Sequence, residues 1–482
     1  MDLNLDHKAH GARKILEIKN HNEISVNNIT YKVDSLDCDI NLLDWIRDNT
    51  PFKGTKEGCN EGDCGACSVL VYDKNDKFPK PINSCLVRLG QLYKKNVITV
   101  EGLGSSKKLN PVQKSFVKNH ASQCGYCTPG FVVAGTSIFY ENEKIDYETI
   151  HDALSGNLCR CTGYVPIIRA LMDVKNFVPP KLIYNDVITS PKIKIGNSTY
   201  FHPKNLKELK NILFNLDHFQ FIAGGTDLNL EREIYDLKES NLVCLENVNE
   251  LKKVSIDKNK IILGSCVSLE EFLKIAKNKI PQIIEIIKRF GSPLIRNQAT
   301  IGGNICTSSP IGDIAPILLT LSSEIITFST KGQRKIPIEK FFKSYRKNIL
   351  YKDEIIEKII IHLPKKNQKL LSWKFSKRYD QDISTLSVCI LYVLENNIIK
   401  EFQIAAGGIA EKPVLLKNIS RQIIGKSIDT SFETLIADIK QYINPISDLR
   451  GSSEYRINTF KGVFIKLKNH LINKVNLQSI MD

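Results

Sequence analysis

Eight of the 13 cysteines stand in two groups within the first 161 residues, and cysteines grouped in this way bind metals or take part in redox chemistry. The first group is Cys59, Cys64, Cys67 and Cys85, and the second is Cys124, Cys127, Cys159 and Cys161. No hydrophobic signal segment precedes them, so we expect a cytoplasmic protein, in which disulfides are rare. The pattern therefore predicts two thiolate sites.

The first group has the C-x4-C-x2-C spacing of plant-type [2Fe–2S] ferredoxins, and Cys85 follows 17 residues later. Gly58, Gly62 and Gly65 allow the loop to bend tightly and bring its backbone N–H groups to the sulfurs. Zinc ligands usually come as two C-x2–4-C units, which a lone distal cysteine does not supply. The spacing therefore favours an iron–sulfur cluster over zinc.

The second group is a C-x2-C pair and, 31 residues later, a C-x-C pair. Each pair precedes a predicted helix, over residues 130–140 and 165–174, and a third helix is predicted over 147–154. Helix N-termini stabilise thiolates. The spacing alone leaves zinc open, although C-x-C is unusual for zinc and the neighbouring ferredoxin-like loop favours a second cluster.

The elements around the first group are predicted as two strands within residues 24–33, a helix over 41–48 and a strand over 68–72. This order is similar to the β-grasp fold of plant-type ferredoxins. The other five cysteines stand mostly in apolar, strand-like contexts, and we expect them to be buried structural thiols. They are Cys38, Cys244, Cys266, Cys306 and Cys389.

Two Gly-Gly segments occur in the second part of the chain. A strand enters a glycine turn at Gly224–Gly225, and a second Gly-Gly loop at Gly302–Gly303 precedes Asp313. Glycine lets backbone N–H groups approach a pyrophosphate, although such turns are as often purely structural. No G-x-G-x-x-G stands nearby, so a Rossmann dinucleotide site is not supported.

The composition is that of a globular, multidomain protein. The chain has 482 residues, of which 42% are hydrophobic and 25% charged. The net charge is +15, and the basic excess lies after residue 180. It reflects either a composition bias or affinity for anions. Because it lacks an Arg-rich tract or interleaved aromatic residues, we expect no nucleic-acid partner, and no apolar run is long enough to predict a membrane span.

The motifs around the second cysteine group resemble the helical iron–sulfur domain of the molybdenum hydroxylases. The matching segments are 101–103, 110–113, 123–130 and 156–164. The two Gly-Gly segments resemble the FAD-binding domain of the same family, which is related to vanillyl-alcohol-oxidase-type flavoproteins. Residues 406–410, 447–450 and 454–456 resemble the C-terminal domain of these flavoproteins.

The resemblance implies a multidomain α+β protein. Its parts would be a β-grasp [2Fe–2S] domain, a [2Fe–2S] domain like a four-helix bundle, a two-part α+β FAD-binding domain and a C-terminal α/β flavoprotein domain. The expected boundaries are an N-terminal extension over 1–22, the four domains over 23–104, 105–178, 195–368 and 369–482, and a linker over 179–194.

The resemblance also implies roles for individual residues. Phe290 would lie near the isoalloxazine ring, Asp313 on the adenosine side, Tyr345 on the nicotinamide side, and Gln123 against the pterin of a molybdenum cofactor. Eukaryotic members of the family carry a flavin-contacting lysine where this chain has Thr385. The remaining FAD residues would be Phe221, Ile222, Ala223, Gly224, Gly225, Thr226, Asp227, Leu228, Thr300, Ile301, Gly302, Gly303 and Asn304.

The implied activity is electron transfer within an oxidoreductase. Purines would be oxidised at a molybdenum cofactor on a partner large subunit, so no catalytic residue is expected on this chain. Electrons would pass through the second cysteine group's cluster, the first group's cluster and FAD to NAD⁺. The implied assembly is a heterotetramer of two small and two large subunits. Alternatives are another heterocycle or an aldehyde as substrate, O2 as acceptor, or a zinc-stapled basic binding module.

Overall fold

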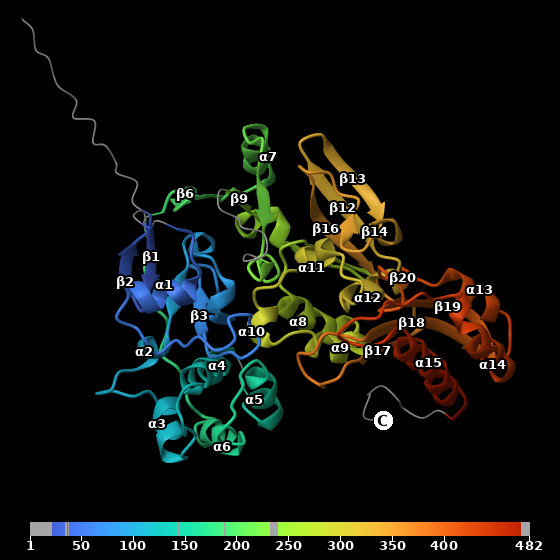
Figure 1. Ribbon diagram of the computed structural model, residues 1–482, viewed down its shortest axis with the longest axis horizontal. Coiled ribbons are helices and arrows are strands. Elements are labelled where there is room, and N and C mark those ends of the chain that lie inside the picture. Colours follow the sequence, from blue (N-terminus) through green and yellow to red (C-terminus); the bar gives the residue numbers. More distant parts are fainter. Residues whose placement is uncertain are drawn as a thin grey trace, which may run out of the picture.

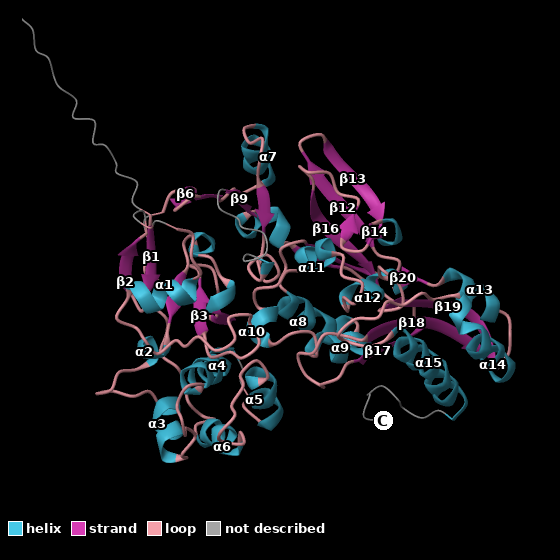
Figure 2. Ribbon diagram, viewed as in Figure 1, coloured by secondary structure: helices cyan, strands magenta, loops and turns pink. Residues whose placement is uncertain are grey.

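The computed structural model describes residues 22–473 except 34–35, 37, 142–143, 188 and 232–239. The expected N-terminal extension lies outside the described residues apart from Asn22. Along the chain, four groups of elements follow one another from the blue strands at one end of the molecule to the red helices at the other (Figure 1). The multidomain α+β architecture expected from the sequence is confirmed, with sheets and helices in alternation (Figure 2).

The first group is a five-stranded sheet of order β2-β1-β5-β3-β4 with one long helix against it. β1 runs parallel to β5, and the other neighbours are antiparallel. Trp45 of the helix is buried with Val26 and Val69 of the sheet. The elements are β1 Glu23–Val26, β2 Ile29–Lys32, α1 Leu42–Asn49, β3 Ser68–Tyr72, β4 Lys80–Asn83 and β5 Asn96–Ile98.

The second group is helical, and its central helix α4 is buried along most of its length. Val133 of α4 packs against Leu70 and Tyr72 of β3, so the helical group rests directly on the first sheet. The helices predicted over 147–154 and 165–174 are present as α5 and α6. The elements are α2 Val100–Leu103, α3 Pro111–Lys118, α4 Thr128–Glu141, α5 Tyr147–Leu154 and α6 Val165–Asp173.

The third group has two sheets. The smaller, of order β6-β7-β9-β8, begins after an extended segment and lies beside the first group. Its elements are β6 Lys192–Ile195, β7 Ser198–Phe201, α7 Leu206–Phe214, β8 Gln220–Ile222 and β9 Ser240–Cys244.

The larger sheet of the third group is antiparallel, of order β10-β11-β16-β12-β13. Helices α8 to α12 pack against this sheet and share one hydrophobic core with it. The strands are β10 Val254–Ile256, β11 Lys260–Gly264, β12 Glu324–Ser329, β13 Gly332–Pro337 and β16 Ile355–His362, with a separate hairpin of β14 Phe342–Ser344 and β15 Lys347–Asn348. The helices are α8 Leu269–Lys279, α9 Ile284–Lys288, α10 Pro293–Arg296, α11 Ile301–Thr307 and α12 Ile314–Thr320.

The last group is an antiparallel sheet of order β17-β18-β19-β20. Three helices bury one face of it, and α12 of the preceding group packs on β18 and β19. The elements are β17 Lys369–Phe375, β18 Leu386–Glu395, β19 Ile398–Gly407, β20 Val414–Leu415, α13 Lys417–Ile423, α14 Ile428–Asp438 and α15 Ser453–Asn473.

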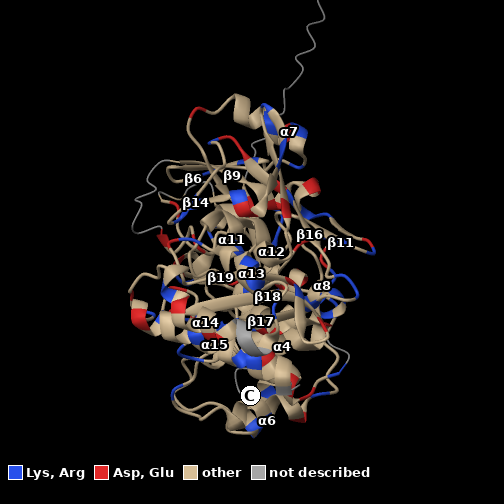
Figure 3. Cartoon of the chain, turned by 90° about the vertical axis from the view of Figure 1, so that its right-hand side faces the viewer, with Lys and Arg blue, Asp and Glu red and all other residues tan. Residues whose placement is uncertain are grey.

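Basic and acidic residues alternate along the chain in many of its elements, as the colouring of the cartoon shows (Figure 3). Within the part of the chain that the structure describes, no helix is both long enough and apolar enough to cross a bilayer.

Candidate iron–sulfur and flavin sites

The four cysteines of the first group lie as two pairs at the edge of the first sheet. The sulfurs of Cys67 and Cys85 are 3.4 Å apart, and the thiols of Cys59 and Cys64 are hydrogen-bonded to each other. The backbone N–H groups of Glu61, Asp63 and Cys64 lie 3.5, 3.3 and 3.3 Å from the Cys59 sulfur. Amide donors of this kind stabilise a thiolate ligand.

Glycines shape this loop as the sequence predicts. Gly62 and Gly65 have φ of +87° and +65°, which side chains rarely adopt. A Cβ on Gly58 would lie 2.5 Å from the Cys64 sulfur, so the backbone passes directly beside that thiol.

The four cysteines of the second group also lie as two pairs. The sulfurs of Cys124 and Cys161 are 3.5 Å apart, and Cys127 is hydrogen-bonded to Cys159. Cys127 directly precedes α4, and the C-x-C segment precedes α6, as predicted. Cys124 and Cys161 are exposed, as is Gln123 beside them.

Each pair holds one thiol with a lowered pKa and one with a raised pKa. The hydrogen bond from Cys64 lowers the pKa of Cys59 to about 5, although burial opposes this, and the backbone N–H groups lower it further. Burial and the bond to Cys159 raise the pKa of Cys127 to about 12. One thiolate is thus favoured in every pair.

This arrangement fits two-iron clusters. A [2Fe–2S] cluster takes four thiolates, two on each iron, and each group supplies two pairs. A single tetrahedral zinc ion needs its ligands to converge on one point. Among the described residues, no three Cys, His, Asp or Glu side chains are grouped to hold one ion.

The two cysteine groups are joined by backbone contacts. The N–H of Leu158, which precedes Cys159, donates to the Cys64 carbonyl at 2.9 Å. The Asn157 side chain donates to the Gly65 carbonyl at 3.0 Å. A Cβ on Gly130 would lie only 2.2 Å from the same carbonyl, so glycine lets α4 approach this closely.

The two Gly-Gly pairs are 78 residues apart in the sequence, and residues that flank the second pair contact the first segment in the structure. A Cβ on Gly224 would lie 2.0 Å from the Gln298 carbonyl, and the Thr307 hydroxyl donates to Asp227 at 2.7 Å. The two glycines predicted a loop over residues 301–304, and this prediction is wrong. These residues form the first turn of α11, because the Thr300 side chain caps that helix by accepting the Gly303 N–H at 3.1 Å.

Backbone donors are available at the first of these segments. Within the described part of the chain, no acceptor is recorded for the N–H groups of Gly225, Thr226 and Asp227. Unpaired amides at a glycine turn suit a phosphate or another anion, so the chain's residues fit a dinucleotide-type cofactor here.

The other predicted flavin residues lie on separate elements of the third group. Phe290 is half-buried, and the amine of Lys374 lies 6.0 Å from its ring centre. Tyr345 is exposed at the tip of the β14–β15 hairpin, which is tied back by an ion pair of 3.0 Å between Arg346 and Glu231. Asp313 is buried with both oxygens engaged, by Lys374 at 2.8 Å and by Ser384 at 2.5 Å.

The Cys85 segment touches the flavin segments. Ile295 of α10 packs on Cys67 and Cys85. The carbonyl of Leu86 accepts hydrogen bonds from Gln298 at 2.8 Å and Asn229 at 2.6 Å. The sequence reasoning identified neither amide, since both lie outside the recognised motifs, nor Lys374, although a lysine within the apolar strand β17 could have drawn attention.

Comparisons with known proteins agree with this geometry. Family models match in three segments: "[2Fe-2S] binding domain" over 99–172, "FAD binding domain in molybdopterin dehydrogenase" over 193–365 and "CO dehydrogenase flavoprotein C-terminal domain" over 372–471. Xanthine dehydrogenase 2 of Arabidopsis thaliana is 28% identical over 90% of this chain, and xanthine dehydrogenase/oxidase of Gallus gallus is 27% identical over 92%. The chain spans 39% of the length of each.

Solved structures show the same fold over 56% of this chain. The Cu,Mo-CO dehydrogenase matches 56% of this chain and 94% of its own with a TM-score of 0.51 at 20% identity. Quinoline 2-oxidoreductase from Pseudomonas putida 86 matches the same shares with a TM-score of 0.51 at 21% identity.

The three matched segments thus resemble iron–sulfur, FAD-binding and flavoprotein C-terminal domains of molybdenum hydroxylases, which supports an electron-transfer role for this chain. The Thr385 hydroxyl donates to the Arg450 carbonyl at 3.1 Å, and the Thr385 carbonyl accepts from Arg456 at 2.9 Å.

The expectation that the other five cysteines are buried is wrong for Cys38. Cys38 is exposed, because it lies in the loop between β2 and α1 and not in a strand; Cys244 and Cys389 are buried, and Cys266 and Cys306 half-buried. Arg456, near the start of α15, is fully buried and donates to the Thr385 and Gly408 carbonyls and to the Asp448 carboxylate, whereas its Nε has no partner among the described residues.

Proposed function

We propose that this chain transfers electrons from purine oxidation, at a molybdenum cofactor on a partner large subunit, to NAD⁺. Cys59, Cys64, Cys67 and Cys85 hold one [2Fe–2S] cluster, and Cys124, Cys127, Cys159 and Cys161 hold the other. FAD occupies the site of residues 221–228 and 300–304, with Phe290, Asp313 and Tyr345 beside it. The proposed domains are 23–104, 105–178, 195–368 and 369–482, and the assembly is a heterotetramer of two small and two large subunits.

One observation carries this proposal: hydrogen bonds join the three sites in a line. Leu158, next to Cys159, donates to the Cys64 carbonyl at 2.9 Å. Gln298 then bridges the Leu86 carbonyl, next to Cys85, and the Gly224 carbonyl of the flavin loop, at 2.8 and 2.6 Å. Hydrogen bonds that link all three segments are expected if electrons pass between the sites, and are not required if the sites act independently.

The protein's part in the chemistry is positioning and insulation. When bound, the clusters supply one-electron carriers, and the flavin supplies the exchange between single electrons and a hydride equivalent. Amides directed at Cys59 favour its thiolate, and Ile295 packs against the buried cluster of residues that contains Cys67 and Cys85. The exposure of Cys124 and Cys161 supports a second cluster near the surface, where a partner could approach it.

The substrate and acceptor rest on resemblance. The similar full-length proteins are named xanthine dehydrogenases, which supports purine oxidation. An exposed Tyr345 and the net charge of +15 favour an anionic dinucleotide as acceptor. A second candidate is the same role with another substrate, since a CO dehydrogenase and a quinoline oxidoreductase share the fold of 56% of this chain.

The test is anaerobic purification of the whole chain followed by cofactor analysis. Four irons, four sulfides and one FAD per chain are expected, and zinc without flavin would overturn the proposal. Anaerobic addition of NADH then tests the acceptor in reverse. Bleaching of the flavin and cluster absorbance supports NAD⁺, whereas bleaching by dithionite alone excludes it. Purine specificity is tested by assaying the complex with its partner against xanthine, quinoline and an aldehyde.

A further inference from the structure

We propose that Gln91 of the ferredoxin-like domain, the proposed domain over residues 23–104, is a positioning residue of the flavin site. This rests on the proposed binding of FAD at residues 221–228. Gln91 lies six residues after Cys85, in the one-turn segment Leu89–Leu92, and outside every motif discussed above. Its role would be to fix the peptide planes of the Gly224 turn from the neighbouring domain.

The Gln91 side chain is buried, 3% exposed, and uses both ends of its amide across the domain boundary. Its nitrogen donates to the Ala223 carbonyl at 3.1 Å and approaches the Gly224 carbonyl at 3.4 Å. The same nitrogen lies 3.3 Å from the Glu246 carboxylate. Its oxygen accepts from the Arg88 N–H at 3.1 Å and from the Asn229 side chain at 3.2 Å.

The geometry of the peptide bond turns these contacts into an orientation of donors. In a planar trans peptide the C=O and the following N–H point in opposite directions. When Gln91 holds the carbonyls of Ala223 and Gly224 toward the ferredoxin-like domain, the N–H groups of Gly224 and Gly225 must point away from it. The Gly225 N–H has no recorded acceptor among the described residues, so it stays available to an anionic ligand.

Neighbouring side chains support the same turn from both domains. The Arg88 guanidinium donates to the Asn229 side chain at 2.7 Å and is itself fixed by Asp39 at 2.6 Å. Gln298, from the flavin part of the chain, also donates to the Gly224 carbonyl, at 2.6 Å. Gln91 thus completes a set of donors that no single domain supplies.

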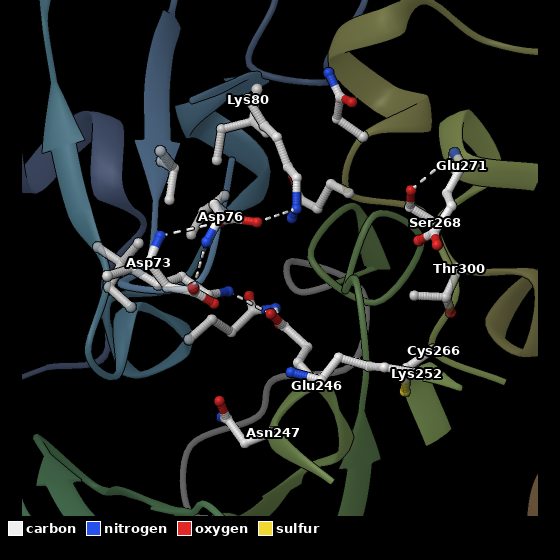
Figure 4. Close-up of a pocket in the computed structure, with 18 residues that line it drawn as sticks. Asp73, Asp76, Lys80, Glu246, Asn247, Lys252, Cys266, Ser268, Glu271 and Thr300 are labelled. Atoms are coloured by element: carbon white, nitrogen blue, oxygen red, sulfur yellow. Dashed lines mark hydrogen bonds and ion pairs between the residues drawn. The ribbon is translucent and has the colours of Figure 1, made fainter. Parts of the chain in front are cut away.

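Gln91 and Lys95 both line a cavity of about 180 Å³, and Lys95 offers a position for a control variant. The cavity is lined from one domain by Asp73, Asp76 and Lys80 and from the other by Glu246, Lys252 and Glu271 (Figure 4). Lys95 pairs with Glu246 across the boundary. Lys95 makes no recorded contact with residues 221–229, so replacing it loosens the domain interface without removing a bond to the flavin loop.

The experiment measures the affinity of the deflavinated full-length chain for FAD by fluorescence titration, with iron and sulfide content determined on the same samples. Gln91→Met keeps the side-chain length and removes the amide, and we expect FAD binding to weaken at least tenfold with four irons retained. The double variant Gln91→Glu/Glu246→Gln keeps the net charge. The carboxylate that it places at position 91 can donate to neither the Ala223 nor the Gly224 carbonyl, so FAD binding should weaken similarly. Lys95→Met should bind FAD as the parent does.

The outcomes separate this inference from the proposed function. If the parent chain binds no FAD, the proposed function fails. Parental affinity in both Gln91 variants would overturn the positioning role alone. Equal weakening in Lys95→Met would show that general domain docking, and not the bonds of Gln91, controls the site. Parental FAD affinity in the double variant, with weakened affinity in Gln91→Met, would show that charge and not the amide controls binding, and this result would also overturn the inference. If Gln91→Met does not fold, the double variant decides.

Discussion

The backbone N–H of Leu158 donates to the carbonyl of Cys64 at 2.9 Å, which joins the segments that carry the two cysteine groups. The donor, Leu158, is the neighbour of Cys159 in the second cysteine group, and the acceptor, Cys64, is itself a member of the first group. The contact depends on close packing of α4 against the ferredoxin-like loop, where a glycine faces a carbonyl.

Gly130→Ala should separate the two cluster sites. Its Cβ would lie 2.2 Å from the Gly65 carbonyl, which is backbone and cannot rotate away. We expect a stability loss of about 1–3 kcal/mol from overpacking and a weaker magnetic interaction between the two reduced clusters in EPR. Gly135→Ala in the same helix is the control, because its Cβ meets only the Leu171 side chain. Unchanged cluster coupling in Gly130→Ala would contradict the proposed contact.

Cys64→Ser should remove one iron–sulfur EPR signal and leave the other. Cys64 pairs with Cys59 in the first group, and the second group makes no use of its sulfur. The measurement is EPR of the dithionite-reduced chain with iron counted per chain, expected to fall by about half. Cys389→Ser, at a buried cysteine of β18, should retain both signals. Two intact signals in Cys64→Ser would contradict the ligand assignment.

Lys374→Met should be strongly destabilising. Lys374 and Asp313 are 1% and 2% exposed, so removal of the amine leaves a buried carboxylate without its counter-charge. Breaking a buried pair in this way costs about 3–5 kcal/mol, measured by urea unfolding. Lys335→Met breaks a pair of similar length with Glu324 at the surface and should cost less than about 1 kcal/mol. Comparable losses in the two variants would show that burial of the Lys374 pair is unimportant.

Acid should destabilise the contact between the ferredoxin-like and flavin domains through His202. Burial lowers the pKa of His202 to about 3, and the ring is stacked on Tyr93 of the other domain with centroids 4.4 Å apart. The unfolded chain therefore binds a proton that the folded chain rejects between pH 6.5 and 3. Stability should fall by about 1.4 kcal/mol per pH unit as the pH decreases through this window.

The check is urea unfolding of the parent and of His202→Phe, which keeps a ring against Tyr93, at pH 7 and pH 5. The variant should lose less stability than the parent on acidification. Equal losses would show that other groups control the acid response.

The sequence was most informative where chemistry is local. The loop around Cys59 and Cys64 could be predicted because a cluster requires fixed spacing and glycines within a short segment. Helices α5 and α6 followed from their periodicity. The helical state of residues 301–304 was missed because two glycines suggest a loop, whereas the Thr300 cap, visible in the sequence, is a helix start signal.

Contacts between distant residues could not be predicted in this way. Gln91 and Gly224 are separated by 133 residues, and Lys374 and Asp313 by 61. Their meeting depends on how whole domains pack, which periodicity and spacing do not encode. The exposure of Cys38, in contrast, agrees with its immediate sequence, because Asp37 and Asp39 flank it.

Burial of Cys67 and Cys85 bears on how a cluster could be inserted. These two thiols are 2% and 5% exposed in the folded chain, and Ile295 of α10 packs against the cluster of residues that contains them. Delivery of iron and sulfide needs open access to both sulfurs. We therefore expect the proposed first site to be loaded before α10 packs against it, whereas the exposed Cys124 and Cys161 permit later delivery to the second site.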